Sequence, residues 1–224
     1  MLKPTQNLLF SSAHERTTVD LADLDHVQHV HRRTLNTARR ELRDVRKRAS
    51  AAEAIAGLDH ETEIFGFTKG QWSLLDLIAA VLDITGPCHL SLSTWTAATY
   101  EIQQLQTWLA RGALTGVRML IDFSMARREP ATTAQLREAV GRDNVRVAQT
   151  HAKFAIWQNP TWSIVCRSSM NLNMNPRYED FQIAHDPELA AFLNRILDAI
   201  WSVQSSAKAD DSPYEIQKHF RDEL

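Results

Sequence analysis

Cysteine is scarce in this chain of 224 residues, which contains only Cys88 and Cys166. Both lie in apolar, strand-like stretches, and no histidine accompanies them at the spacing of a zinc site. The sequence therefore predicts neither a disulfide framework nor a metal centre. We interpret both residues as buried free thiols, which are typical of a reducing compartment such as the cytoplasm.

Long apolar runs and an excess of one charge are also missing. No stretch approaches the roughly 18 consecutive apolar residues of a membrane span, and the first residues lack the apolar core of a signal peptide. We therefore expect a cytoplasmic chain without a transmembrane segment. The formal net charge is −2, so binding to nucleic acid would require a local basic patch.

Glycine and proline are absent from Thr5 to Ala56, which predicts a helical N-terminal extension over residues 1–57. A heptad stripe within it indicates either a coiled coil or a helix lying on its own domain. The extension is rich in arginine, and its basic side chains either form a solvated helix face or contact a nucleic acid backbone. These candidate nucleic-acid-binding residues are Arg32, Arg33, Arg39, Arg40, Arg43, Arg46, Lys47 and Arg48.

Strand-like and helix-like periodicities alternate from residue 58 to residue 203. The predicted strands are 61–67, 88–95 and 117–123, and the predicted helices are 71–84, 97–111, 131–140 and 187–203; residues 144–148 lead into the hairpin. This alternation, followed by a β-hairpin, predicts an α/β domain with a mixed β-sheet sandwiched by helices. We expect a flexible C-terminal tail over 204–224. At the ends of two predicted strands, Trp95 either covers the core or reaches a site, and Asp122 is either a site neighbour or a helix cap.

Reactive residue types are crowded in one stretch, from residue 151 to residue 183. His151 and Lys153 are separated by one residue in an alternating apolar run, which predicts that both project from the same face of a strand. A turn at 158–160 precedes a second predicted strand and a polar loop. The resulting hairpin would bring Ser169 and Asn171 beside His151 and Lys153.

Such a cluster fits phosphoryl transfer without a metal. An imidazole can attack phosphorus, a lysine neutralises phosphate charge, and serine and asparagine donate hydrogen bonds to phosphate oxygens. A carboxylate such as Glu179 can hold the imidazole in the reactive tautomer. A strand histidine is, however, often a structural residue, and an asparagine-rich stretch also occurs in ordinary turns.

The stretch resembles the phospholipase D superfamily, whose signature is His-x-Lys, an Asp five residues after the Lys, Gly-Ser-x-Asn and a later Glu. His151-x-Lys153, Ser168-Ser169-Met170-Asn171 and Glu179 fit this signature. The resemblance implies that His151 is a nucleophile forming a phosphohistidine, that Lys153, Ser169 and Asn171 bind phosphate, and that Glu179 orients His151. Gln158 replaces the usual Asp, which is more structural than chemical in that family, and Ser168 replaces the usual Gly.

The chain carries one His-x-Lys motif of this kind and no internal repeat, whereas the family's chemistry usually needs two facing histidines. The resemblance therefore implies a homodimer with both copies of His151 in one cleft at the two-fold axis. We interpret the chain as a metal-independent phosphodiesterase without a cofactor, in the first place a nuclease acting on DNA rather than RNA. The alternatives are a catalytically inactive module that binds nucleic acid or phosphate, and a phospholipid hydrolase or transferase.

Overall fold

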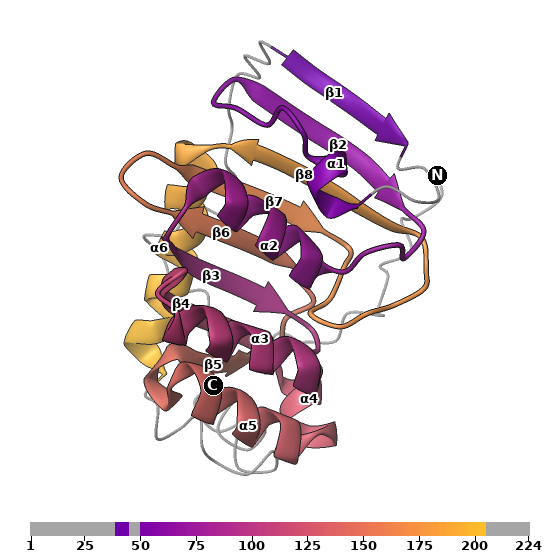
Figure 1. Ribbon diagram of the computed structural model, residues 1–224. Helices are drawn as coiled ribbons and strands as arrows, with labels where there is room; N and C mark the ends of the chain where they lie inside the picture. The colour runs from indigo at the N-terminus through magenta and orange to yellow at the C-terminus, as the bar shows by residue number, and fades with distance from the viewer. Residues whose placement is uncertain (1–38, 45–49, 205–224) are drawn as a thin grey trace, which may run out of the picture.

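The computed structural model describes residues 39–44 and 50–204. Its strands are β1 (Arg39–Asp44), β2 (Thr62–Thr68), β3 (Cys88–Thr94), β4 (Leu114–Asp122), β5 (Val145–Ala148), β6 (Phe154–Gln158), β7 (Ser163–Ser168) and β8 (Glu179–His185). They form one eight-stranded sheet in the order β1-β2-β8-β7-β6-β3-β4-β5 (Figure 1). β6 and β8 run antiparallel to their neighbours, and the other pairs are parallel. The predicted mixed sheet is thus confirmed.

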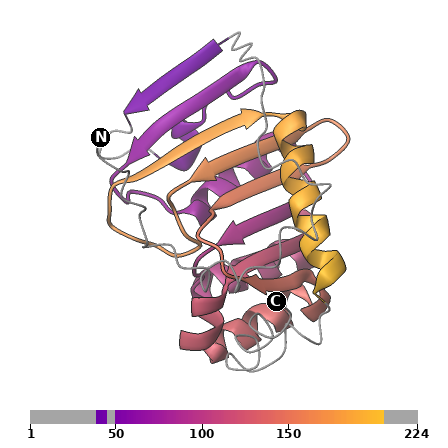
Figure 2. The ribbon, with the colours of Figure 1, turned by 180° about the vertical axis from the view of Figure 1, so that it is seen from behind.

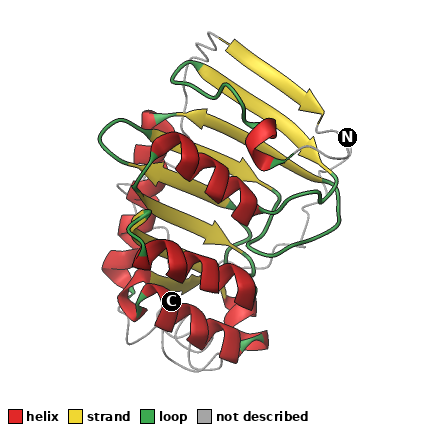
Figure 3. Ribbon diagram, viewed as in Figure 1, coloured by secondary structure: helices red, strands yellow, loops and turns green. Residues whose placement is uncertain are grey.

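Helices cover both faces of this sheet, as predicted. They are α1 (Ala51–Ala54), α2 (Leu74–Thr85), α3 (Thr99–Ala110), α4 (Phe123–Arg128), α5 (Pro130–Val140) and α6 (Pro187–Val203), with a 3-10 turn at Arg142–Asn144. Figures 1 and 3 show α1, α2, α3 and α5 in front of the sheet, and Figure 2 shows α6 crossing the opposite face. The strands are therefore the middle layer of three.

β4 shows why the chain adopts three layers. Met119 and Ile121 are buried in the core beneath α2, α3 and α5, whereas Leu120 between them is buried against α6. A strand with apolar side chains on both faces is stable only when both faces are covered, since each buried side chain of this size contributes about 1.5 to 3 kcal/mol. The predicted free thiols Cys88 and Cys166 are both buried.

The predicted N-terminal helix is wrong over residues 39–44, which form the edge strand β1 parallel to β2. Arg40 lies opposite Glu63 in the register, and its Nε donates to the Glu63 carboxylate at 2.6 Å. This pairing satisfies backbone groups along β2 and joins opposite charges across the strands. Tertiary pairing thus overrides the helix propensity of a segment without glycine or proline. Leu42, on the predicted heptad stripe, is 75% exposed.

The arginines of β1 have partners within the chain. Arg39 forms an ion pair with Asp59, and Arg43 pairs with Glu41 and donates to the carbonyl of Ala54 at 3.0 Å. These contacts attach β1 to the segment around α1, so the proposed contact of Arg39, Arg40 and Arg43 with nucleic acid would compete with them. The other basic residues of that prediction, Arg32, Arg33, Arg46, Lys47 and Arg48, lie outside the described residues. None of the helices described in residues 39–44 and 50–204 has the length and apolar character of a membrane span.

Two histidines and a tryptophan form a cluster at the edge of the sheet where β2 begins and β8 ends. His60 stacks on Trp162 with ring centroids 4.0 Å apart, and His185 meets His60 edge to face at 4.5 Å. The backbone N–H of Ser163 donates to Nδ1 of His185 at 3.2 Å. This ring nitrogen must be unprotonated to accept the bond. Burial lowers the pKa of His185, and the nearby His60 lowers it further.

Stability is therefore expected to fall as the solution becomes acidic. Because its pKa is lowered by folding, His185 takes up a proton more readily in the unfolded chain. Its contribution is complete above the ordinary value of about 6.5 and is lost as the pH falls through the lowered pKa. The urea midpoint should drop between about pH 7.5 and pH 5, and less so in His185→Asn, which can still accept the Ser163 bond. An equal drop in both proteins would contradict this assignment.

Candidate active site

The predicted hairpin is present, but its first strand starts later than expected. β6 and β7 pair antiparallel, with Ala155 opposite Cys166. His151 and Lys153 precede β6, so the prediction that they lie within a strand is wrong. The chain before β6 is held by other contacts: the Thr150 N–H donates to Asp122 at 3.0 Å, and the Ser93 hydroxyl donates to the Ala152 carbonyl at 2.8 Å. His151 is left exposed to solvent.

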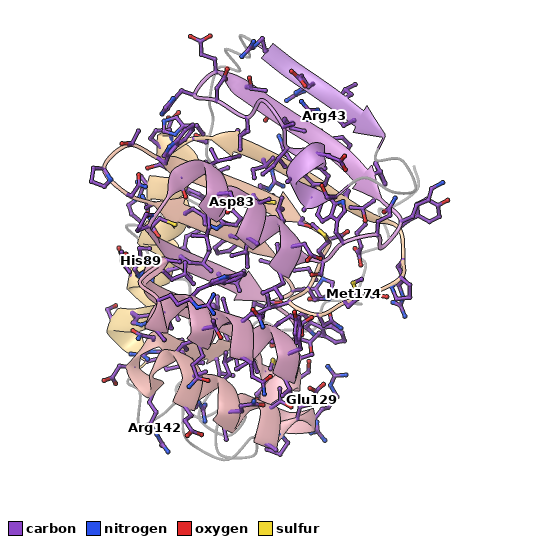
Figure 4. The ribbon with its side chains drawn as sticks, in the orientation of Figure 1. Arg43, Asp83, His89, Glu129, Arg142 and Met174 are labelled. Atoms are coloured by element: carbon purple, nitrogen blue, oxygen red, sulfur yellow. The ribbon has the colours of Figure 1, made fainter. Side chains whose placement is uncertain are left out.

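All five predicted catalytic residues belong to one edge of the sheet. β3, β4 and β7 end at this edge, whereas β6 and β8 begin there, as the strand registers require. Met174, in the loop that contains Asn171, lies on the side of the molecule toward which β2 and β3 point, and His89 lies on the opposite side (Figure 4). The carboxyl ends of neighbouring parallel strands are a common location for ligand sites in α/β proteins.

Lys153 lies against the imidazole of His151. Its Nζ is 3.4 Å from Nδ1 and 3.3 Å from Nε2, and it donates to the His151 carbonyl at 3.0 Å. Partial burial lowers the pKa of Lys153, and the carboxylates of Glu179 and Asp122 oppose this shift. The three charged groups are therefore close enough to interact. A phosphate at His151 would gain an ammonium group as its counter-charge.

Glu179 contacts Ser169 rather than His151. The Ser169 hydroxyl donates to the Glu179 carboxylate and accepts the backbone N–H of Asp180 at 3.0 Å. Among the hydrogen bonds of the described residues, none joins Glu179 to His151. In this arrangement the Ser169 hydroxyl proton is bound to Glu179. Ser169 therefore holds that carboxylate in place near Lys153.

Asn171 connects two loops of the site. Its Oδ1 accepts the backbone N–H of Trp95 at 3.2 Å, which leaves the side-chain amide Nδ2 to donate to a ligand. The next residue, Leu172, binds the hydroxyl of Thr94 and the carbonyl of Thr96, both through its N–H at 3.1 Å. The loop after β7 is thereby tied to the end of β3. This places Asn171 and Trp95 at the same edge as His151.

Asp122 and Trp95 both lie next to His151 or its neighbour Thr150. The sequence had left open whether either residue reaches the site. One oxygen of Asp122 caps α4 by accepting the Ser124 N–H at 2.8 Å, and the other accepts the Thr150 N–H next to His151. Asp122 is thus both a helix cap and a support of the site. The Trp95 ring meets the His151 imidazole edge to face, with centroids 5.9 Å apart at 60°.

The departures from the phospholipase D signature have structural roles here. Gln158 lies at the far end of β6 from Lys153, and its side-chain oxygen Oε1 accepts a hydrogen bond from Nδ2 of Asn194 in α6 at 2.6 Å. Ser168 donates to the Asp180 carbonyl at 2.8 Å and accepts the Met170 N–H at 2.9 Å. Both side chains are therefore engaged by other groups of the chain.

Two features of the site were missed by sequence reasoning. Arg128, at the end of α4, lies over the Trp95 ring with its guanidinium carbon 4.6 Å from the centroid. β8 was also missed, although Phe181 and Ile183 alternate with polar residues in a pattern that could have revealed it. Among the described residues, no group of three or more His, Cys, Asp and Glu side chains is placed to hold a metal ion.

No protein-family profile matches the sequence, and no curated protein matches it. Among solved structures, the crystal structure of a polyphosphate kinase from Porphyromonas gingivalis is similar, with a TM-score of 0.46 and 16% sequence identity. The match covers 62% of this chain and 26% of the kinase chain. The chain thus spans about a quarter of that protein's length.

Proposed function

We propose that this chain is a metal-independent phosphodiesterase of phospholipase D-like chemistry, and specifically a nuclease. The observation that carries the proposal is that Lys153 lies against the exposed His151 at a sheet edge where Glu179 acts on Lys153 and Asn171 binds Trp95, the neighbour of His151. A nucleophile, a cation, an amide donor and a carboxylate are the groups needed to attack and stabilise a phosphodiester.

The proposed reaction has two steps. A ring nitrogen of His151 attacks phosphorus, the bond to one ester oxygen breaks, and that oxygen takes a proton from His151 of a second copy. The second imidazole then removes a proton from water, whose oxygen attacks phosphorus and releases His151. One water is consumed per cycle, and both imidazoles return to their starting protonation states. Lys153 offsets the phosphate charge in both steps.

The proposal is tested by incubating labelled single- and double-stranded DNA and RNA with the protein in excess EDTA. Cleavage supports a metal-independent nuclease, and the four substrates reveal whether it prefers one or two strands and which sugar it prefers, for which we expect DNA over RNA. The second candidate function is a catalytically inactive module that binds nucleic acid. Gln158, at the position of the usual Asp, favours this alternative. Salt-dependent binding without cleavage of any substrate would favour that function, and phosphatidyl substrates would then be the next to try.

The homodimer makes a separate prediction. If one site uses both copies of His151, a mixed dimer of wild-type and His151→Ala chains has lost either its nucleophile or its acid. After subunit exchange at constant wild-type concentration, an increasing excess of His151→Ala should suppress cleavage almost completely. Light scattering should show twice the chain mass. Cleavage that is unaffected by the mutant chain would show that each copy works alone, and the composite site would be refuted.

A further inference from the structure

Arg128 is separated from the proposed nucleophile, His151, by a single aromatic ring. Its guanidinium carbon is 4.6 Å from the centroid of the Trp95 ring, and the same ring meets the His151 imidazole at 5.9 Å. The backbone N–H of Trp95 donates to the side chain of Asn171. Arg128 therefore belongs to the scaffold of the site, although it lies in a different element from the five residues of the signature.

The position of Arg128 is fixed while its charge is left available. Its Nε donates to the Ser124 carbonyl at 3.2 Å, one turn earlier in α4. Within residues 39–44 and 50–204, Arg128 takes part in no ion pair, and its side chain is exposed. An arginine stacked on an aromatic ring keeps its outer N–H groups free, and these groups match the oxygens of a phosphate.

A second pair of this kind lies at the same edge. Nζ of Lys69 is 5.4 Å from the centroid of the Tyr178 ring. Lys69 follows β2, and Tyr178, which is 69% exposed, immediately precedes Glu179 at the start of β8. Lys69, like Arg128, takes part in none of the ion pairs found in the described part of the chain.

The strand order places these two pairs on opposite sides of His151. From β2 the sheet continues through β8, β7 and β6, whose ends at this edge carry Glu179, Ser169 and the His151–Lys153 segment. β3 and β4 follow, and they lead into Trp95 and into the helix that carries Arg128. The edge therefore presents a cation on an aromatic ring, then the catalytic cluster, then another cation on an aromatic ring.

We propose that this edge binds a single-stranded polynucleotide that crosses it from Lys69 to Arg128. Lys153 binds the phosphate that is attacked, and Arg128 and Lys69 bind phosphates on either side of it. This inference rests on the proposed function and extends it: the substrate is a chain of phosphodiesters rather than an isolated one. Single-strand binding proteins combine cations along the backbone with aromatic side chains in the same way.

The test measures binding of a labelled oligodeoxythymidylate of about 12 nucleotides by fluorescence anisotropy at several salt concentrations. All proteins carry His151→Asn, so that the strand is not cleaved. Arg128→Gln and Lys69→Gln should each weaken binding and reduce the slope of log affinity against log salt by about 0.7, the value for one phosphate contact on a single strand. Arg128→Lys should keep the slope, and a urea midpoint for each variant confirms that it is folded.

Arg127→Gln is the matched control, because Arg127 is an exposed neighbour in α4 without an aromatic partner among the described contacts. Equal slopes for Arg127→Gln and Arg128→Gln would overturn the inference. An abasic strand of the same length should show the same loss with Arg128→Gln; a loss confined to the strand with bases would overturn the assignment to phosphate.

A second assay separates this inference from the proposed function. With His151 present, Arg128→Gln and Lys69→Gln should each lower kcat/KM more for the oligodeoxythymidylate than for bis(4-nitrophenyl) phosphate, which has one phosphate. An equal reduction on both substrates would place the two cations in the reaction itself and overturn their role at flanking phosphates. If the unmodified protein fails to hydrolyse any phosphodiester, the proposed function fails, while the salt slopes still decide whether the edge binds a polynucleotide.

Discussion

Replacement of His151 by alanine is expected to reduce phosphodiester cleavage by on the order of 10⁴-fold or more, as happens when a nucleophile is removed from other covalent catalysts. The effect is large because one substitution removes both the nucleophile and, through the second copy, the group that protonates the leaving oxygen. Folding should be unaffected, since His151 is exposed and precedes β6. The measurement is single-turnover cleavage in excess EDTA, with the urea midpoint determined in parallel.

His185→Asn is the matched control for this experiment, because it removes a histidine at the opposite edge of the sheet. Its cleavage at neutral pH should equal that of the unmodified protein. Labelled substrate should also form a covalent adduct on His151 that survives alkaline denaturing conditions and is lost in acid, as expected for a phosphorus–nitrogen bond. Cleavage by His151→Ala at the unmodified rate would exclude His151 as the nucleophile and, with it, the proposed mechanism.

Much of the central sheet could be predicted because its apolar patterns are local. The alternation in Phe154–Gln158, the turn at 158–160 and the buried run ending at Asp122 each specify an element through its own residues. The same holds for the placement of His151 and Asn171 at one edge of the sheet, since a hairpin and a short loop connect them. Patterns within one segment were sufficient for these features.

Contacts between distant segments could not be predicted in this way. β1 is a strand because β2 offers it an unpaired edge and Glu63 offers Arg40 a partner, and neither is visible in residues 39–44 themselves. The stacking of Arg128 on Trp95 likewise joins the ends of different elements. Glu179 was expected beside His151 but binds Ser169, because the register of β7 against β8 sets its position.

Replacement of Glu179 by glutamine is expected to lower kcat/KM by about 10²- to 10³-fold, the usual effect of removing one electrostatic group from a preorganised site. Glutamine keeps the size of the side chain and can still accept the Ser169 hydroxyl. The loss of activity therefore measures the effect of removing the negative charge. That charge opposes the burial that lowers the pKa of Lys153. Without it the pKa of Lys153 falls further, and the alkaline limb of the pH–rate profile, where the ammonium is lost, should move to lower pH.

Ser169→Ala separates the charge of Glu179 from its position. It removes the hydrogen bond that fixes the carboxylate but keeps the negative charge beside Lys153. Activity should fall, while the alkaline limb stays nearer to that of the unmodified protein than it does in Glu179→Gln. Lys153→Met, which has no ammonium to lose, should abolish the alkaline limb altogether. If Glu179→Gln and Ser169→Ala gave the same pH profile, Glu179 would act through geometry alone, as a group that orients the site rather than one that holds the charge of Lys153.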